Sequence, residues 1–212
     1  MSDAAPDAAL DAGAKSPHLD EREQRQAASR APLGPLVIHE IVREQGEVEL
    51  RRSFSGLAWS ALASGLSIGF SMLAQAYLQS MLPHAPWAHL IAGFGYSVGF
   101  LIVILGRQQL FTETTLTALI PTLTRRDLPT LRATLRVWAI VLAANLVGTW
   151  AFGAIAAQPG IFSDGARAAM ADMAHDMMAA PFWVTLIRGG SAGWLIGLMV
   201  WLLPSAGPSR PL

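Results

Sequence analysis

The sequence predicts an all-α membrane protein in which four helices cross the bilayer and the second of them is broken. Charged residues make up only 14% of the 212 residues, hydrophobic residues make up 52%, and the mean hydropathy is +0.39. A soluble domain carries about 25% charged residues. Four stretches of eighteen to twenty-five residues each contain at most one formally charged side chain, and about 20 apolar residues cross a bilayer core of roughly 30 Å. Directly after the second stretch, the polar run GRQQLFTETTLTALIPTL interrupts the apolar pattern.

The segment before the first apolar stretch has two parts. Residues 1–34 are rich in Ala, Asp, Glu, Arg and Pro, and we expect a disordered cytoplasmic tail because this composition buries too little apolar surface to fold. Residues 36–54 interleave apolar and charged side chains and predict a short amphipathic cytoplasmic helix, broken at Gly46. Such a helix either lies on the membrane surface or packs on its own chain, and the pattern does not choose between the two.

The four predicted spans cover residues 56–80, 88–105, 137–158 and 182–203, and a short tail, 204–212, follows them. Loops rich in arginine stay in the cytoplasm. The predicted outer loops, 81–87 and 159–181, contain a single arginine, Arg167. The sequence therefore predicts a multi-pass protein of the inner (plasma) membrane with a cytoplasmic N-terminus. The arginines on the predicted cytoplasmic side are Arg43, Arg51, Arg52, Arg125, Arg126, Arg132 and Arg136.

Small residues recur at four-residue intervals in every span. Helices in lipid associate through close backbone approach, which small side chains permit. These positions predict tight helix packing, although a glycine in the same place also leaves room in a pore. The series are Ala61, Gly65 and Gly69; Gly95 and Gly99; Ala144 and Gly148; and Gly189, Gly193 and Gly197.

The polar run after the second span predicts a break in the helix at membrane depth. Non-helical backbone is tolerated there only where protein or a water-filled cavity satisfies it. Gly106 suits a helix end, and Thr112 suits the N-cap of a half-helix over residues 113–120 that Pro121 stops. Glu113 would then lie in its first turn, where the helix dipole favours an anion. Broken helices of this kind mark solute sites in transporters.

Three motifs carry a resemblance to the formate/nitrite transporter family. LFTETTLTALIP (110–121) resembles the segment that opens the half-helix after that family's broken second span. WAIVLAANLVG (138–148) resembles its third span, with Asn145 and Gly148 at the family's Asn and Gly. GGSAGWLIGLMVW (189–201) resembles its fourth span. The three occur in the family's order, and the resemblance covers roughly residues 36–203.

The resemblance implies an aquaporin-like channel fold of six spans in two inverted repeats, assembled as a homopentamer in the lipid bilayer. It implies passage of a small monovalent anion such as formate or nitrite, or its conjugate acid, without a cofactor. Leu110, Phe111, Thr112, Glu113, Thr114 and Thr115 would line the solute path, with Phe111 as a constriction. Asn145 would hold the broken loop, and Gly193 stands where the family has an asparagine; both are further candidates for the solute path.

The chain also departs from the family's pattern. Gln109 stands where an acidic residue is common, and the fifth and sixth spans, with their central histidine, have no counterpart, so the fold is incomplete, with four of six transmembrane helices. Two functions follow as alternatives: a channel or transporter of the formate/nitrite type, or a truncated, transport-inactive remnant of one.

Two charged residues near the break allow opposite interpretations. Arg107 either attracts an anion at a cytoplasmic vestibule, or it pairs with Glu113 or anchors at the lipid headgroups, because an isolated charge in the bilayer centre costs at least about 2.5–3.5 kcal/mol. Glu113 either carries a proton or only caps its helix. We expect no enzymatic activity, because helical spacing places no histidine near Glu113. Zero net charge argues against nucleic acid as a partner, and the absence of cysteine excludes thiolate metal sites.

Overall fold

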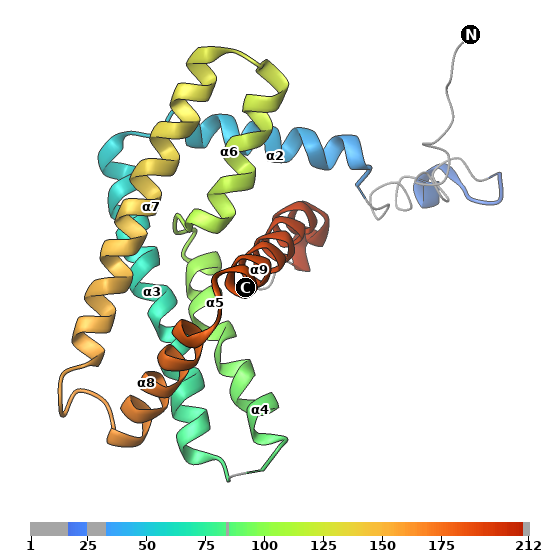
Figure 1. Cartoon of the computed structure of the whole chain (residues 1–212). Helices are drawn as coiled ribbons and strands as arrows, with labels where there is room; N and C mark the ends of the chain where they lie inside the picture. Colours follow the sequence, from blue (N-terminus) through green and yellow to red (C-terminus); the bar gives the residue numbers. More distant parts are fainter. Residues whose placement is uncertain (1–16, 25–32, 84, 210–212) are drawn as a thin grey trace.

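The computed structural model describes residues 17–24, 33–83 and 85–209. Most of the tail predicted for residues 1–34 lies outside this part. Within it, the regular secondary structure is helical, and no strand occurs (Figure 1). The helices are α2 (Pro35–Leu50), α3 (Phe54–Met81), α4 (Ala88–Gly95), α5 (Ser97–Leu105), α6 (Phe111–Arg125), α7 (Leu128–Ala156), α8 (Asp164–Ala179), α9 (Phe182–Leu202) and the 3-10 helix η2 (Leu203–Ser209).

Four helical segments of the described chain are long and apolar enough to cross a membrane, as predicted: Phe54–Met81, Ala88–Leu105, Leu128–Ala156 and Phe182–Ala206. The third begins at Leu128 instead of residue 137, because the Asp127 carboxylate accepts a hydrogen bond of 2.7 Å from the Thr130 amide and caps the helix. The apolar stretch therefore marks only the part of α7 that suits lipid. The more polar residues before it extend the helix at its N-terminal end.

Glycines bring α3 into close contact with α7 and α5. A Cβ added at Gly65 would lie 2.3 Å from the Asn145 carbonyl oxygen, and one at Gly99 would lie 2.4 Å from the Ser71 hydroxyl. The predicted packing role is confirmed at these positions. Gly189 and Gly193 of α9 make no such contact within the described chain, because an added Cβ meets nothing within 4 Å there.

Helix α2 lies across the end of the bundle where α6 joins α7 (Figure 1). It packs on its own chain, because Ile38 and Val42 are buried in a cluster with Ile120 of α6 and Val200 of α9. The predicted break at Gly46 is wrong. Gly46 is a buried helical residue that lies against α6, where an added Cβ would be 2.0 Å from the Thr117 carbonyl oxygen.

Helix α6 differs from the predicted half-helix at both ends. It begins at Phe111 with Leu110 as N-cap, so Thr112 is not the cap, and it continues through Pro121 to Arg125. A proline in a helix removes the hydrogen bond to the carbonyl four residues earlier, here that of Thr117. Gly46 lies directly against that carbonyl, so α6 is packed against α2 at the point where the sequence predicted its end.

An ion pair outside the spans joins α2 to the far end of α6. Arg125 Nη2 lies 2.7 Å from the Glu47 carboxylate, and Arg43 contacts the same carboxylate. The hydrogen bond from Arg125 and the positive charges of Arg125 and Arg43 outweigh desolvation and hold the pKa of Glu47 below its ordinary value of 4.5. This pair supports the α2–α6 packing at neutral pH.

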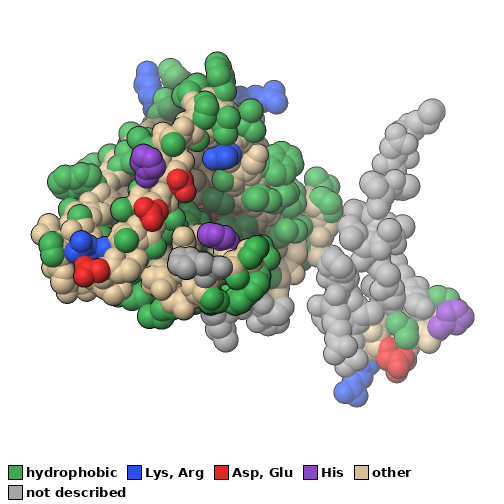
Figure 2. Space-filling model, turned by 60° about the horizontal axis from the view of Figure 1, so that its bottom comes forward, with side chains coloured by type: hydrophobic (Ala, Val, Ile, Leu, Met, Phe, Trp, Pro, Cys, Tyr) green, Lys and Arg blue, Asp and Glu red, His purple; other side chains and the backbone are tan. Residues whose placement is uncertain are grey.

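The outer surface suits a lipid environment. Trp59, Phe94, Trp150 and Trp194 are each 71–78% exposed. On the side of the α3–α4 and α7–α8 connections, charged side chains are few and lie among hydrophobic ones (Figure 2). Exposed apolar area on this scale marks a membrane or protein contact.

Candidate functional site

The site is built around the break between α5 and α6. Helix α5 ends at Leu105, and residues 106–110 leave the helical path until α6 begins at Phe111. Arg107 has a φ of 46°, a left-handed conformation that is uncommon outside glycine. The Gln108 amide donates a hydrogen bond of 3.0 Å to the Val103 carbonyl and so ties the start of the break to the end of α5.

Two polar side chains from other helices hold the break. The Asn145 amide of α7 donates to the Gln109 carbonyl (3.0 Å) and to the Ala61 carbonyl (2.7 Å), and its oxygen accepts from the Phe111 amide (2.8 Å). Ser60 of α3 accepts from the Gln109 amide over 3.1 Å. Asn145 is only 8% exposed, so these bonds replace water for backbone groups that have no helical partner.

A polar cavity of about 500 Å³ opens beside the break, and we call it the break cavity. Its apolar walls come from α5, α9 and η2. Glu49 of α2 lines it but is paired with Arg52 at 3.2 Å. Arg107 and Glu113 line it too. The ion pair between Arg107 and Glu113 that the sequence allowed is wrong, because neither side chain forms an ion pair within the described residues. The polar lining consists of Gln45, Glu49, Arg107, Gln108, Gln109, Glu113, Thr114 and Thr117.

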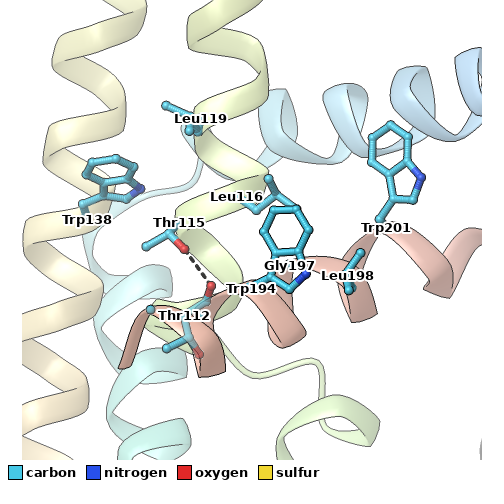
Figure 3. A pocket seen from close by; sticks show the side chains of 11 residues that line it. Thr112, Thr115, Leu116, Leu119, Trp138, Trp194, Gly197, Leu198 and Trp201 are labelled. Carbon is cyan, nitrogen blue, oxygen red and sulfur yellow. Dashed lines mark hydrogen bonds between the residues drawn. The ribbon is translucent and has the colours of Figure 1, made fainter. Parts of the chain in front are cut away.

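A second cavity of about 480 Å³ lies on another face of α6, between α6 and α9, and is mostly apolar (Figure 3). Thr112 and Thr115 line it from α6, and Gly193 lines it from α9. The Thr115 hydroxyl donates a hydrogen bond of 2.7 Å to the Thr112 carbonyl, so its proton is used within α6. The Trp138 side chain lines the same cavity, and its indole nitrogen is buried without a partner among the described residues.

The structure therefore divides the predicted path residues between two faces of α6. Glu113 and Thr114 line the break cavity, whereas Thr112, Thr115 and Gly193 line the apolar one.

Neither cavity is lined by Leu110, Phe111 or Asn145, three residues that were predicted for the path. Leu110 is the N-cap of α6. Phe111 packs against the α3–α7 cluster that contains Leu57 and Val141. This placement gives Phe111 a packing contact where the sequence suggested a constriction.

Some residues of the site were missed from the sequence. Gln45 and Glu49 reach the break cavity from α2, Gln108 lines it beside Arg107, and Ser60 holds the loop. The charge alternation in α2 gives no signal for which side chains face the break, and Ser60 is one of several serines in an apolar span. The described residues contain no group of three or more His, Cys, Asp or Glu that could hold a metal ion.

Comparison with known proteins shows the family to which the chain belongs. The family described as formate/nitrite transporter matches residues 36–209, from α2 to η2. The chain belongs to the formate/nitrite transporter family. It is also 38% identical over 185 residues to the inner membrane protein YfdC of Escherichia coli K12, an alignment that covers 85% of this chain and 58% of that protein. The chain thus spans less than two thirds of the length of this relative.

Membership confirms the resemblance seen in the three motifs. Together with the four apolar helices it makes the chain a multi-pass protein of the inner membrane, in contact with lipid, from a family of membrane transporters.

Proposed function

We propose that this chain passes a small monovalent anion, such as formate or nitrite, or its conjugate acid, along the break between α5 and α6. The observation that carries the proposal is Arg107. Its guanidinium lines the break cavity without an acidic partner in the described chain, and a guanidinium binds carboxylate-like anions with paired hydrogen bonds. Asn145 fixes the loop that presents it.

The proposed orientation places α2 and the break cavity on the cytoplasmic side. Arg51 and Arg52 at the end of α2 and Arg125 and Arg126 at the end of α6 lie outside the four spans, which the positive-inside rule assigns to the cytoplasm. Arg107 would then meet solute arriving from that side.

Assembly with further copies, as a homopentamer by family resemblance, is part of the proposal. Only 6% of the apolar window of the last span is buried within the chain. Arg188 of this helix is exposed and unpaired among the described residues, and a bare charge facing lipid is costly. The same exposed helix also agrees with the alternative function, a transport-inactive remnant of such a channel.

Uptake by proteoliposomes tests the proposal. We expect vesicles containing the purified chain to take up labelled formate or nitrite faster than empty vesicles. Arg107→Gln should raise the solute concentration needed for half-maximal uptake. Uptake no faster than in empty vesicles would favour the inactive alternative.

A further inference from the structure

We propose that the outward face of α7 binds an anionic phospholipid, with the phosphate on two arginines and an acyl chain along the apolar residues that follow them. This inference does not depend on the solute or on the cavities beside α6. We call the surface the α7 lipid face, and it consists of the exposed residues Arg132, Arg136, Ala139, Ala143, Leu146, Val147 and Trp150.

Helical spacing places these residues on one side of α7. Residues three, four and seven positions apart share a face of a helix, and Arg132 is followed at this spacing by the exposed positions 136, 139, 143, 147 and 150. The buried Val141 and Gly148 lie on the opposite face, against α3. Helix α7 runs along one edge of the bundle (Figure 1), so the α7 lipid face is directed away from the other described helices.

The two arginines lie at the depth of lipid headgroups. Arg136 is the last charged residue before the uncharged stretch 137–158, so both guanidinium groups lie where the apolar part of the span begins. The Arg136 guanidinium is oriented by the backbone, because its Nη2 donates to the Leu50 carbonyl over 2.8 Å and to the Arg52 carbonyl over 3.2 Å. A guanidinium carries five donors, so Arg136 keeps further donors for a phosphate.

No acidic side chain of the described residues neutralises these charges. Neither Arg132 nor Arg136 forms an ion pair there. Asp127 is the one acidic residue between positions 114 and 163, and its carboxylate accepts hydrogen bonds from the amide and the hydroxyl of Thr130. Arginine binds phosphate through paired, charge-assisted hydrogen bonds. The charge of the site is therefore complementary to a phosphate group.

The apolar part of the face selects a lipid over a soluble phosphate. Trp150 lies fourteen residues after Arg136, which is about 21 Å along a helix, and one leaflet of hydrocarbon is about 15 Å thick. The face is thus long enough for an acyl chain that reaches the bilayer midplane. Ala139 and Ala143 have small side chains and leave room beside the helix directly after the arginines. A phosphate followed by an apolar chain matches this order of residues.

Thermal unfolding of the purified full chain in a mild non-ionic detergent measures the binding. Phosphatidylglycerol should raise the unfolding temperature. Phosphatidylcholine with the same acyl chains should not, and neither should inorganic phosphate nor glycerophosphoglycerol, which has no acyl chain, at the same concentrations. An equal rise with any of these three would overturn the inference.

The arginine variants locate the site. Arg132→Gln should raise the phosphatidylglycerol concentration for the half-maximal shift by about fivefold, which is the attraction that one arginine gains near an anionic surface. Without lipid it should unfold at the wild-type temperature, because Arg132 is exposed. Arg132→Lys keeps the charge and should bind nearly as tightly as the wild type. An Arg132→Gln protein with the wild-type affinity would overturn the inference.

Arg126→Gln is the matched control. It removes the same charge at the same end of the bundle, but Arg126 follows α6, and its Nε donates to the Leu123 carbonyl. This variant should bind phosphatidylglycerol as the wild type does. An equal loss of affinity in Arg126→Gln and Arg132→Gln would show a diffuse attraction to surface charge and would overturn the site.

A cysteine on the α7 lipid face tests whether a second copy covers it instead. The chain has no cysteine of its own, so Ala143→Cys carries a single thiol in the exposed apolar part of the face. In oxidised membranes it should form no disulfide between copies, because lipid covers the thiol. A disulfide-linked dimer would place a second copy on this face and overturn the inference.

Discussion

Replacing Asn145 with leucine should loosen the break without disturbing the surrounding helices. Leucine is close in size to asparagine but removes all three hydrogen bonds, of 2.7, 2.8 and 3.0 Å, that join α7 to the break and to α3. Such bonds contribute about 0.6 kcal/mol each in membrane proteins and about 1 kcal/mol in soluble ones. The Phe111 amide and the Gln109 carbonyl also lose these partners, so we expect a loss of about 2–3 kcal/mol in the free energy of unfolding.

Two measurements on purified protein in detergent check this value. Reversible unfolding in a denaturing detergent gives the free energy of unfolding, and hydrogen exchange reports whether the Phe111 amide loses protection. Thr149→Val is the matched control one turn along α7, because the Thr149 hydroxyl donates only to carbonyl oxygens, those of Asn145 and Gly65. It should cost less than about 0.5 kcal/mol. An Asn145→Leu protein as stable and as protected as the control would refute the anchoring role.

Three further outcomes follow from the packing and charges. Gly46→Ala should destabilise the protein and expose α2 to proteolysis, because the added methyl group has no space against α6; unchanged cleavage would contradict this. Gly65→Ala should lower the unfolding temperature, whereas Gly193→Ala should keep or raise it, since its Cβ meets nothing and alanine is the better helix former; equal effects would contradict it. The folded pKa of Glu47 is lowered, so its bond to Arg125 stabilises the fold above the ordinary carboxyl pKa of 4.5 and is lost as pH falls through the folded value. Glu47→Gln should remove that part of the acid-induced fall in unfolding temperature, and an identical pH dependence would argue against it.

The spans and the break were predictable because they depend on composition alone. Residues 88–105 are mostly apolar, and Arg107, Gln108 and Gln109 follow directly after them. This change is visible without any tertiary contact. The ends of α6 were not predictable in this way, since α6 continues through Pro121 to Arg125 and packs there against Gly46 of α2, far away in sequence.

The site was predictable to a similar extent. Asn145 and the 110–115 segment were found through the family motif, and Asn145 does contact the break. The division of the path residues between two cavities follows from the direction of each side chain on α6. The contribution of Glu49 follows from the docking of α2. Both depend on contacts between distant segments that local pattern does not encode.

Thiol labelling in membranes tests most directly whether the break faces a solute route inside the bilayer, because the chain has no cysteine of its own. In Gln109→Cys, the new thiol replaces a partly exposed side chain of the break cavity. It should react with a small water-soluble thiol reagent, and formate should slow the reaction. Leu146 of α7 is 61% exposed, and the thiol of Leu146→Cys should not react, because lipid covers it. An unreactive thiol at position 109, a reaction that formate does not slow, or equal reaction at position 146 would contradict a lipid-enclosed route through the break.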